Sequence, residues 1–146
     1  MRGNLLGGVA VASQTAVVDM TVWVDDWQMD CCGEPFSVGS QVSWTIGRES
    51  SDWLRRILGE NTDVKIDAFE DRHVGLPEGT LPTRGTVTAI KAAYCRYAAR
   101  PGDERTRYPV SGSGVLVPLT QAGRFQEDRG ELQFMGYVVQ LAVPDA

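Results

Sequence analysis

The chain has 146 residues, of which 42% are hydrophobic and 23% are charged, and its net charge is −5. A chain of this length and composition forms a single globular domain that needs no disulfide bond or metal to fold, which excludes a disordered tail, a collagen-like chain and a disulfide-rich miniprotein. The acidic total disfavours nucleic-acid binding, which depends mainly on phosphate neutralisation by lysine and arginine.

The N-terminal segment, residues 1–19, is rich in glycine and small residues and contains no convincing strand or helix pattern. We therefore expect a flexible extension over residues 1–19 and one small domain over residues 20–146. The segment resembles a signal peptide only weakly, and no apolar run reaches the roughly 18 residues of a membrane helix. Three cysteines, two of them adjacent, do not form a disulfide framework. The sequence thus predicts a cytoplasmic protein with no membrane contact.

Strand-forming stretches follow one another along the rest of the chain, each rich in β-branched or aromatic residues or alternating between polar and apolar ones. Residues 85–97 form the longest stretch, which is long enough to bend and to serve two sides of a barrel. In residues 115–119, Pro118 places the strand at a sheet edge or at a bulge. The expected strands are residues 21–25, 41–46, 64–69, 85–97, 115–119 and 132–143.

One helix is expected over residues 52–58. Ser50 or Ser51 can cap it, Asp52 favours its first turn, and Gly59 ends it. Its apolar residues recur at helical spacing on one side, which predicts a helix that packs on a sheet rather than a catalytic element. The apolar stripe consists of Trp53, Leu54, Ile57 and Leu58.

Together these elements predict a mainly β fold: a small, strongly bent, antiparallel and barrel-like sheet of five or six strands with one short helix. Glycines at positions where barrel strands turn corners favour this closed form. An open α+β sandwich is the alternative. The residues expected in the core are Val22, Val24, Val42, Trp44, Ile46, Leu54, Ile57, Val87, Ile90, Val138 and Leu141.

Residues 23–36 contain the highest density of chemically active side chains, with four carboxylates, two thiols and two indoles. If the first strand stays regular, Trp23, Asp25 and Trp27 lie on one face, with the carboxylate between two aromatic rings. Such a face can hold a cation or a polar ring, or raise the carboxylate pKa by desolvation. A bulge at residues 25–26 would aim the carboxylates differently. The alternative is that both indoles belong to the core and the carboxylates are solvated at a strand end.

We predict that this segment forms the mouth of the barrel, with the turn over residues 32–35 at its rim. The first hypothesis is a non-enzymatic module that holds a small ligand or a partner peptide there. The second is a small enzyme that uses Asp25, Asp26 or Glu34 as acid or base, together with a thiol of Cys31 or Cys32. The first is favoured, because the sequence has one histidine and no recognisable catalytic set. The candidate ligand-binding residues are Trp23, Asp25, Asp26, Trp27, Cys31, Cys32, Glu34 and Tyr94.

The cysteines raise the question of a metal site. Cys31, Cys32, Cys95 and His73 make a four-ligand set of the kind that zinc accepts. However, adjacent cysteines lack the usual ligand spacing, and neighbouring side chains on a strand point to opposite faces. We therefore expect no metal and no cofactor. The cysteines are then free or buried, or one of the adjacent pair is a reactive thiol.

Charge is distributed unevenly along the chain. Residues 20–71 hold 11 acidic and 4 basic side chains, whereas residues 72–129 hold 5 acidic and 9 basic ones. The two regions either attract one another within the fold or form faces of opposite sign. Arginines at positions 96, 100, 105 and 107, with nearby tyrosines, resemble the surface of single-strand nucleic-acid binders. This Arg96–Arg107 surface is the basis of a third hypothesis. A solvated hairpin over residues 99–109 explains it equally well, so nucleic acid is not the expected partner.

The run MTVWVDDWQM over residues 20–29, followed by CCGEPF over residues 31–36, resembles an actinobacterial family catalogued as domain of unknown function 6578. Residues 39–44, 85–97 and 136–139 resemble further parts of that family, so the similarity covers most of residues 20–143. The resemblance implies a bacterial, cytosolic, single-domain protein. It implies no activity and no catalytic residue. The expected partner therefore stays a small molecule or a protein.

Overall fold

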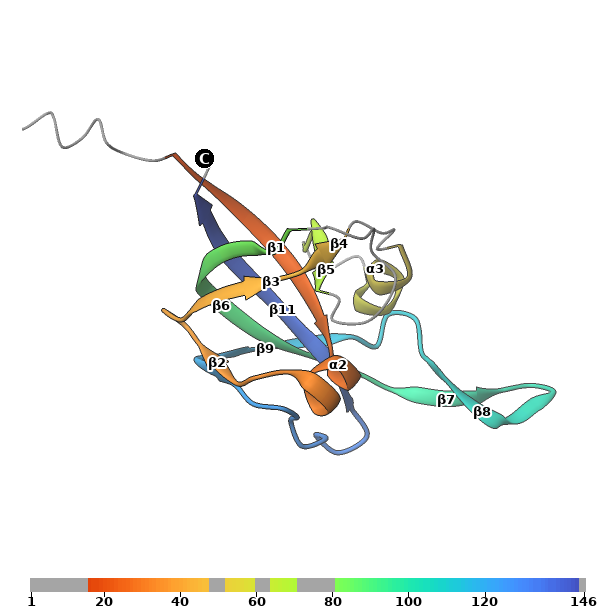
Figure 1. Cartoon of the computed structure of the whole chain (residues 1–146). Coiled ribbons are helices and arrows are strands. Elements are labelled where there is room, and N and C mark those ends of the chain that lie inside the picture. Colours follow the sequence, from red (N-terminus) through yellow and green to blue (C-terminus); the bar gives the residue numbers. More distant parts are fainter. Residues whose placement is uncertain (1–15, 48–51, 60–63, 71–80, 145–146) are drawn as a thin grey trace, which may run out of the picture.

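A computed structural model of the chain describes residues 16–47, 52–59, 64–70 and 81–144. These residues form a mainly β fold whose main sheet is bent into a nearly closed barrel, with two helices (Figure 1). The predicted fold class is confirmed. The prediction of a single helix is wrong, because a second helix, α2 (Asp26–Cys32), follows the first strand directly.

The main sheet contains β1 (Val17–Asp25), β3 (Gln41–Trp44), β4 (Ile46–Gly47), β5 (Ala68–Glu70), β6 (Thr83–Cys95), β9 (Val115–Leu119) and β11 (Gln133–Pro144). Six of them follow the order β3-β6-β11-β1-β5-β4, and β9 also pairs with β6. The pairs are antiparallel except β1 with β5, which are parallel. β3 and β4, at the two ends of this order, are separated by Thr45 alone, which explains why the sheet nearly closes.

Two smaller sheets lie beside the barrel. β2 (Phe36–Ser37) pairs with β10 (Gln121–Ala122). β7 (Tyr97–Arg100) and β8 (Asp103–Pro109) pair with each other and project from the barrel as an arm (Figure 1). The predicted exposed hairpin is therefore present, and most of it is strand, with a shift in register between Ala99 and Arg100.

Several boundaries differ from the predictions. β1 begins at Val17, inside the segment expected to be an extension, because residues 17–19 pair with the end of β11. Strand structure within residues 64–69 begins only at Ala68, and residues 41–46 are divided into β3 and β4. Ser50 and Ser51, the expected helix caps, lie outside the described residues. The predicted helix itself is confirmed as α3 (Asp52–Leu58), which ends at Gly59 with φ +85°.

The long strand β6 bends at a bulge. Gln140 of β11 is opposite Ala89, but the next residue, Leu141, is opposite Val87, so Thr88 has no partner in this ladder. Before the bulge β6 pairs with β3, and after it β6 pairs with β9. The bulge therefore lets one strand serve two sides of the barrel, as the sequence predicted.

Apolar side chains form two clusters, one on each side of the sheet. The cluster inside the barrel includes edge-to-face aromatic contacts of Phe36 with Trp44, at 5.1 Å between centroids, and with Tyr137, at 6.0 Å. The outer cluster lies under α3, where Trp53 meets Trp23 edge to face at 6.0 Å. Of the residues expected in the core, all are buried except Val42 and Ile46, which are partly buried against the inner cluster.

Candidate functional site

The segment predicted as the site changes from strand to helix at Asp25. Asp25 is the N-cap of α2, with φ −65° and ψ 147°, and Asp26 accepts a hydrogen bond at Oδ1 from the backbone N–H of Trp27 at 2.8 Å. The helix ends at Gly33, whose N–H donates to the Met29 carbonyl at 3.1 Å. A Cβ at Gly33 would come within 2.7 Å of Met29 Cα, so only glycine fits this close approach.

Because the strand stops at Asp25, the predicted common face of Trp23, Asp25 and Trp27 does not form. Trp23 lies on the outer face of β1 under α3 and is 1% exposed, whereas Trp27 lies on α2 and is 51% exposed. Among the described residues the Trp23 Nε1 group has no hydrogen-bond partner. The two indoles therefore have different roles, one in the core and one at the surface.

Helix α2 closes this end of the barrel. Met29 is 1% exposed and packs in the inner cluster, and the buried Gln28 donates from Nε2 to the Glu70 carbonyl of β5 at 3.1 Å. Trp27 and Asp30 are exposed on the helix. Side chains thus fill the predicted mouth, and the outer side of α2 faces solvent.

Two residues outside the predicted ligand-binding set, Cys95 and Tyr97, lie beside each other, and Tyr97 is close enough to Asp25 and Asp26 for their charges to act on it. Their side chains are hydrogen-bonded to each other. Burial raises the pKa of Tyr97 to about 12, and the charges of Cys95, Asp26 and Asp25 add to the shift. Burial also raises the pKa of Cys95. At neutral pH the phenol and the thiol therefore keep their protons, and Cys95 is not an activated nucleophile.

The carboxyl group of Asp26 is itself perturbed. Burial raises its pKa, and the neighbouring charges of Asp25 and Asp30 raise it further. Backbone hydrogen bonds from Trp27 and from Asp26 itself act in the opposite direction. The acidic side chains at the start of α2 are thus close enough to repel one another.

Tyr94, one of the candidate ligand-binding residues, is 3% exposed and belongs to the inner cluster, with its ring 5.9 Å from that of Phe134. Cys95 follows it on the opposite face of β6, in the outer cluster. Neighbouring side chains on a strand alternate between its two faces, and this pattern could have distinguished Cys95 from Tyr94 in the sequence. Cys95 lies on the outer face with Trp23, whereas Tyr94 lies on the inner face.

The remaining predicted residues are distributed around α2. Cys31 and Cys32 belong to the helix rather than to a turn, and their side chains lie outside the described residues. Glu34 is exposed and lines a pocket of about 310 Å³ together with residues of β2 and β3. The structure therefore places Asp25 and Asp26 near Tyr97. Glu34 lies apart from these three residues, in the pocket beside β2 and β3.

No group of three or more histidine, cysteine or acidic side chains in the described ranges is placed to hold a metal ion. His73, one member of the zinc set that the sequence suggested, falls outside those ranges. The expectation of no metal at Cys31, Cys32 and Cys95 stays a prediction.

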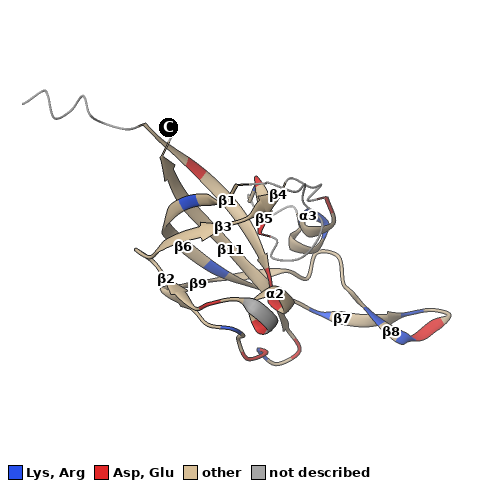
Figure 2. Cartoon of the chain, in the orientation of Figure 1, with Lys and Arg blue, Asp and Glu red and all other residues tan. Residues whose placement is uncertain are grey.

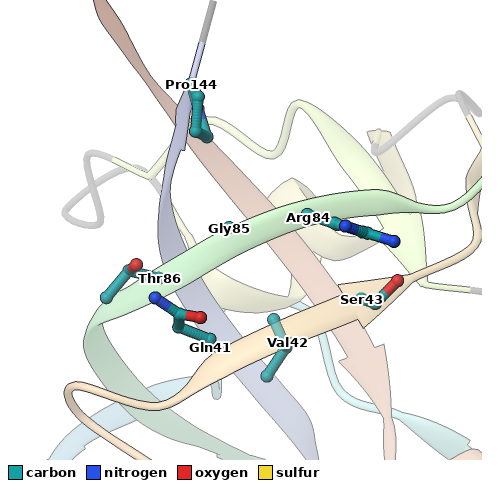
Figure 3. A pocket seen from close by; sticks show the side chains of 7 residues that line it. All are labelled: Gln41, Val42, Ser43, Arg84, Gly85, Thr86 and Pro144. Atoms are coloured by element: carbon teal, nitrogen blue, oxygen red, sulfur yellow. The ribbon is translucent and has the colours of Figure 1, made fainter. Parts of the chain in front are cut away.

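A second pocket, of about 360 Å³, lies between β3, the first part of β6 and the end of β11 (Figure 3). Gln41 and Ser43 are the cross-strand partners of Thr86 and Arg84. Arg84 is the one charged residue among the seven that line it. A single cation in an open polar cleft indicates no particular chemistry.

The β7–β8 arm carries the basic surface suggested by the sequence. Figure 2 shows Lys and Arg along the arm, with acidic residues near its tip and on α2. Within the arm, Arg107 donates from Nη2 to the Tyr97 carbonyl at 2.7 Å, and the Arg100 guanidinium lies 3.8 Å from the Tyr108 ring centroid. Two of the four arginines are therefore engaged within the arm itself.

The model of a family of unknown function, DUF6578, matches residues 18–143. The chain belongs to this family. The match confirms the family resemblance seen in the sequence. The matched region begins one residue after the first residue of β1 and ends one residue before the last residue of β11. No curated protein and no solved structure matches the chain.

Neither helix in the part of this DUF6578 protein that the structure describes has the length and apolar composition needed to cross a membrane.

Proposed function

We propose that this DUF6578 protein is a non-enzymatic binding module whose α2 end docks a partner protein. The observation that supports the proposal is the half-exposed Trp27 on α2, flanked along the helix by the carboxylates of Asp26 and Asp30. An exposed indole beside acidic groups suits a partner segment that carries lysine or arginine, through cation–π contact and charge attraction. We also propose that the protein is bacterial, from an actinobacterium, and cytoplasmic, as the family resemblance implies.

The way α2 is held supports docking over the other ligand classes. Gln28 and Met29 fix the helix to the barrel, so Trp27 is presented on a rigid surface and little order has to be gained on binding. A small molecule inside the mouth is less well supported, because side chains fill that end of the barrel. The protonated states of Cys95 and Tyr97 give no support to an enzyme.

Nucleic-acid binding by the β7–β8 arm is the second candidate, favoured by the way the arm projects from the barrel (Figure 1). Its basic surface is reduced by the internal contacts of Arg100 and Arg107 and by Asp103 and Glu104 near the tip. A fluorescent single-stranded oligonucleotide would test this candidate. Binding that weakens steeply with salt and is lost in Arg105→Gln would favour it over the α2 surface.

Loss of the exposed indole tests the proposal directly. The protein and its Trp27→Ala variant would each be used to capture partners from host lysate, with thermal unfolding showing that both fold. We expect the captured proteins to be lost with Trp27→Ala and reduced with Asp26→Asn, because the two changes remove the aromatic surface and a carboxylate.

The matched control is Leu81→Ala, which removes a large apolar side chain that is 82% exposed before β6. This variant should capture the same proteins as the wild type. If Trp27→Ala folds and captures them too, the α2 end is scaffold and the binding surface lies elsewhere.

A further inference from the structure

The chain contains two lysines, Lys65 and Lys91, and both line the same pocket. The pocket lies on the outer face of the sheet and has a volume of about 450 Å³. This volume falls in the range of roughly 300 to 1,000 Å³ that is typical of small-molecule sites. The sequence does not dictate that the two lysines meet, because Lys91 is in β6 and Lys65 is in the segment before β5. The other lining residues are Thr21, Val64, Asp67, Ala89, Val138 and Gln140.

Strand register shows how the floor of the pocket is built. Gln140 of β11 lies between Thr21 of β1 and Ala89 of β6. Two residues earlier in β11, Val138 is opposite Lys91 of β6. Residues two apart on a strand share a face, so these five side chains form two neighbouring rows on the outer face. The bulge at position 88 produces this arrangement, since it places residues 89 and 91 outside while Val87 and Ile90 are in the inner cluster.

The segment before β5 forms the wall of the pocket and carries Lys65. Two hydrogen bonds hold it against β1: the Asp67 N–H donates to the Thr21 carbonyl at 2.8 Å, and the Thr21 N–H donates to Asp67 Oδ2 at 2.8 Å. Ile66, between Lys65 and Asp67, is buried in the outer cluster. The backbone that carries Lys65 is therefore fixed beside the sheet.

The charges and surfaces in the pocket favour an anion. Lys65 and Lys91 are exposed, and neither ammonium group forms an ion pair with a described residue. Asp67 is the one carboxylate among the lining residues, and one of its oxygens already accepts the Thr21 N–H. The Gln140 amide can donate further hydrogen bonds, and the valine and alanine side chains offer an apolar surface.

We propose that this pocket binds a small organic dianion, either a phosphate ester or a dicarboxylate. Two ammonium groups match its two negative charges, and the valine and alanine residues of the lining can contact its carbon skeleton. This site is separate from the proposed docking surface on α2, and it goes beyond that function by giving the protein a metabolite ligand.

The two lysines make a direct test possible on the full chain. Reductive methylation with ¹³C-formaldehyde labels the lysine amines and the N-terminal amine, and dimethylated lysine keeps its positive charge. The labelled protein would be titrated by NMR with glycerol 3-phosphate, with succinate and with inorganic phosphate, and with sodium chloride at matched ionic strength. We expect both lysine signals to shift and to saturate with one or both organic anions. The anion that saturates them distinguishes a phosphate-ester from a dicarboxylate site.

Variants connect the signals to the pocket. By calorimetry on unmodified protein, Lys65→Gln and Lys91→Gln should each weaken binding by about tenfold or more, because each removes a charge-assisted hydrogen bond. Arg84→Gln, which removes the exposed cation of the pocket between β3 and β6, should change nothing. Trp27→Ala should also leave the titration unchanged, so failure here and failure of the docking proposal are distinguishable.

The proposal would be overturned if neither organic anion shifts the lysine signals more than sodium chloride does. It would also be overturned if Arg84→Gln weakens binding as much as the lysine variants do. Saturation by inorganic phosphate alone would overturn the assignment of an organic ligand.

Discussion

The α2 end of the barrel and the β7–β8 arm differ both in charge and in what holds them in place. Helix α2 has seven residues, and its N-cap Asp25 makes no side-chain capping hydrogen bond. A helix this short is not stable by itself, so its structure depends on the burial of Gln28 and Met29 against the barrel. The acidic surface of α2 is therefore held in place by the barrel.

The arm is held mainly by its own contacts. β7 and β8 pair only with each other in the described part of the chain, and within the arm Tyr108 donates a hydrogen bond to Asp103 at 2.5 Å. A single two-stranded hairpin is marginally stable in water. A partner of α2 would therefore lose little entropy on docking, whereas a partner of the arm would also have to stabilise the arm.

The largest expected effect comes from the residue that anchors α2. Met29→Ala removes a fully buried side chain from the inner cluster. We expect it to lower the free energy of unfolding by about 2 to 5 kcal/mol, because a cavity is left at the end of the barrel. Urea unfolding followed by tryptophan fluorescence measures this loss.

The control is Asp30→Ala on the exposed side of the same helix, which should change the free energy of unfolding by less than about 0.5 kcal/mol. If Met29→Ala costs as little as this control, α2 is not anchored in the way described, and the contrast with the arm disappears.

A smaller effect is expected in the arm. Tyr108→Phe removes the hydrogen bond to Asp103, which contributes about 1 kcal/mol. Because the arm has few contacts with the barrel, we expect hydrogen exchange to become faster in β7 and β8 and to stay unchanged in β6 and β11.

Tyr137→Phe is the matched change inside the barrel, where the Tyr137 hydroxyl donates to the Gly123 carbonyl at 2.8 Å and accepts from Gln126 at 3.0 Å. It should lower protection in all barrel strands together. Equal effects of Tyr108→Phe on the arm and on the barrel would show that the two unfold as one unit.

The smallest effect concerns Asp26, which links the two regions because its charge acts on Tyr97 at the base of the arm. Burial raises the pKa of Asp26 above the ordinary value of 3.8. Its protonated form is thus favoured in the folded state, and this contribution to stability is present below pH 3.8 and is lost as the pH rises through the raised pKa.

Asp26→Asn should therefore raise the melting temperature at pH 7 and have no such advantage at pH 3. Thermal melts of both proteins across this range measure the difference. An advantage that does not change with pH would contradict the assigned burial of the carboxyl group.

Local patterns in the sequence were sufficient for much of the fold. The stripe of Leu54, Ile57 and Leu58 followed by Gly59 predicted α3, because helical periodicity and a glycine stop are local signals. Residues 115–119 were predicted as a strand and form β9 with the same bounds. The density of carboxylates and indoles in residues 23–36 predicted a binding site there, and that binding site stays a prediction.

Tertiary structure alone decided the arrangement of that site. Helix α2 has no apolar stripe along its whole length. It forms because Gln28 and Met29 are buried against the end of the barrel. β11 has a second bulge at Met135, where its register with β6 shifts between Phe134 and Gly136. This bulge and the one at Thr88 set which side chains face outward, so Cys95 rather than Tyr94 lies on the same face as Trp23. Strand register positions Lys91, and the two hydrogen bonds between Asp67 and Thr21 position Lys65, so long-range contacts bring the two lysines into one pocket. The sequence determined most of the long strands of the main sheet. Register, bulges and long-range burial, which are properties of the whole sheet, decided the short strands, helix α2 and which residues meet.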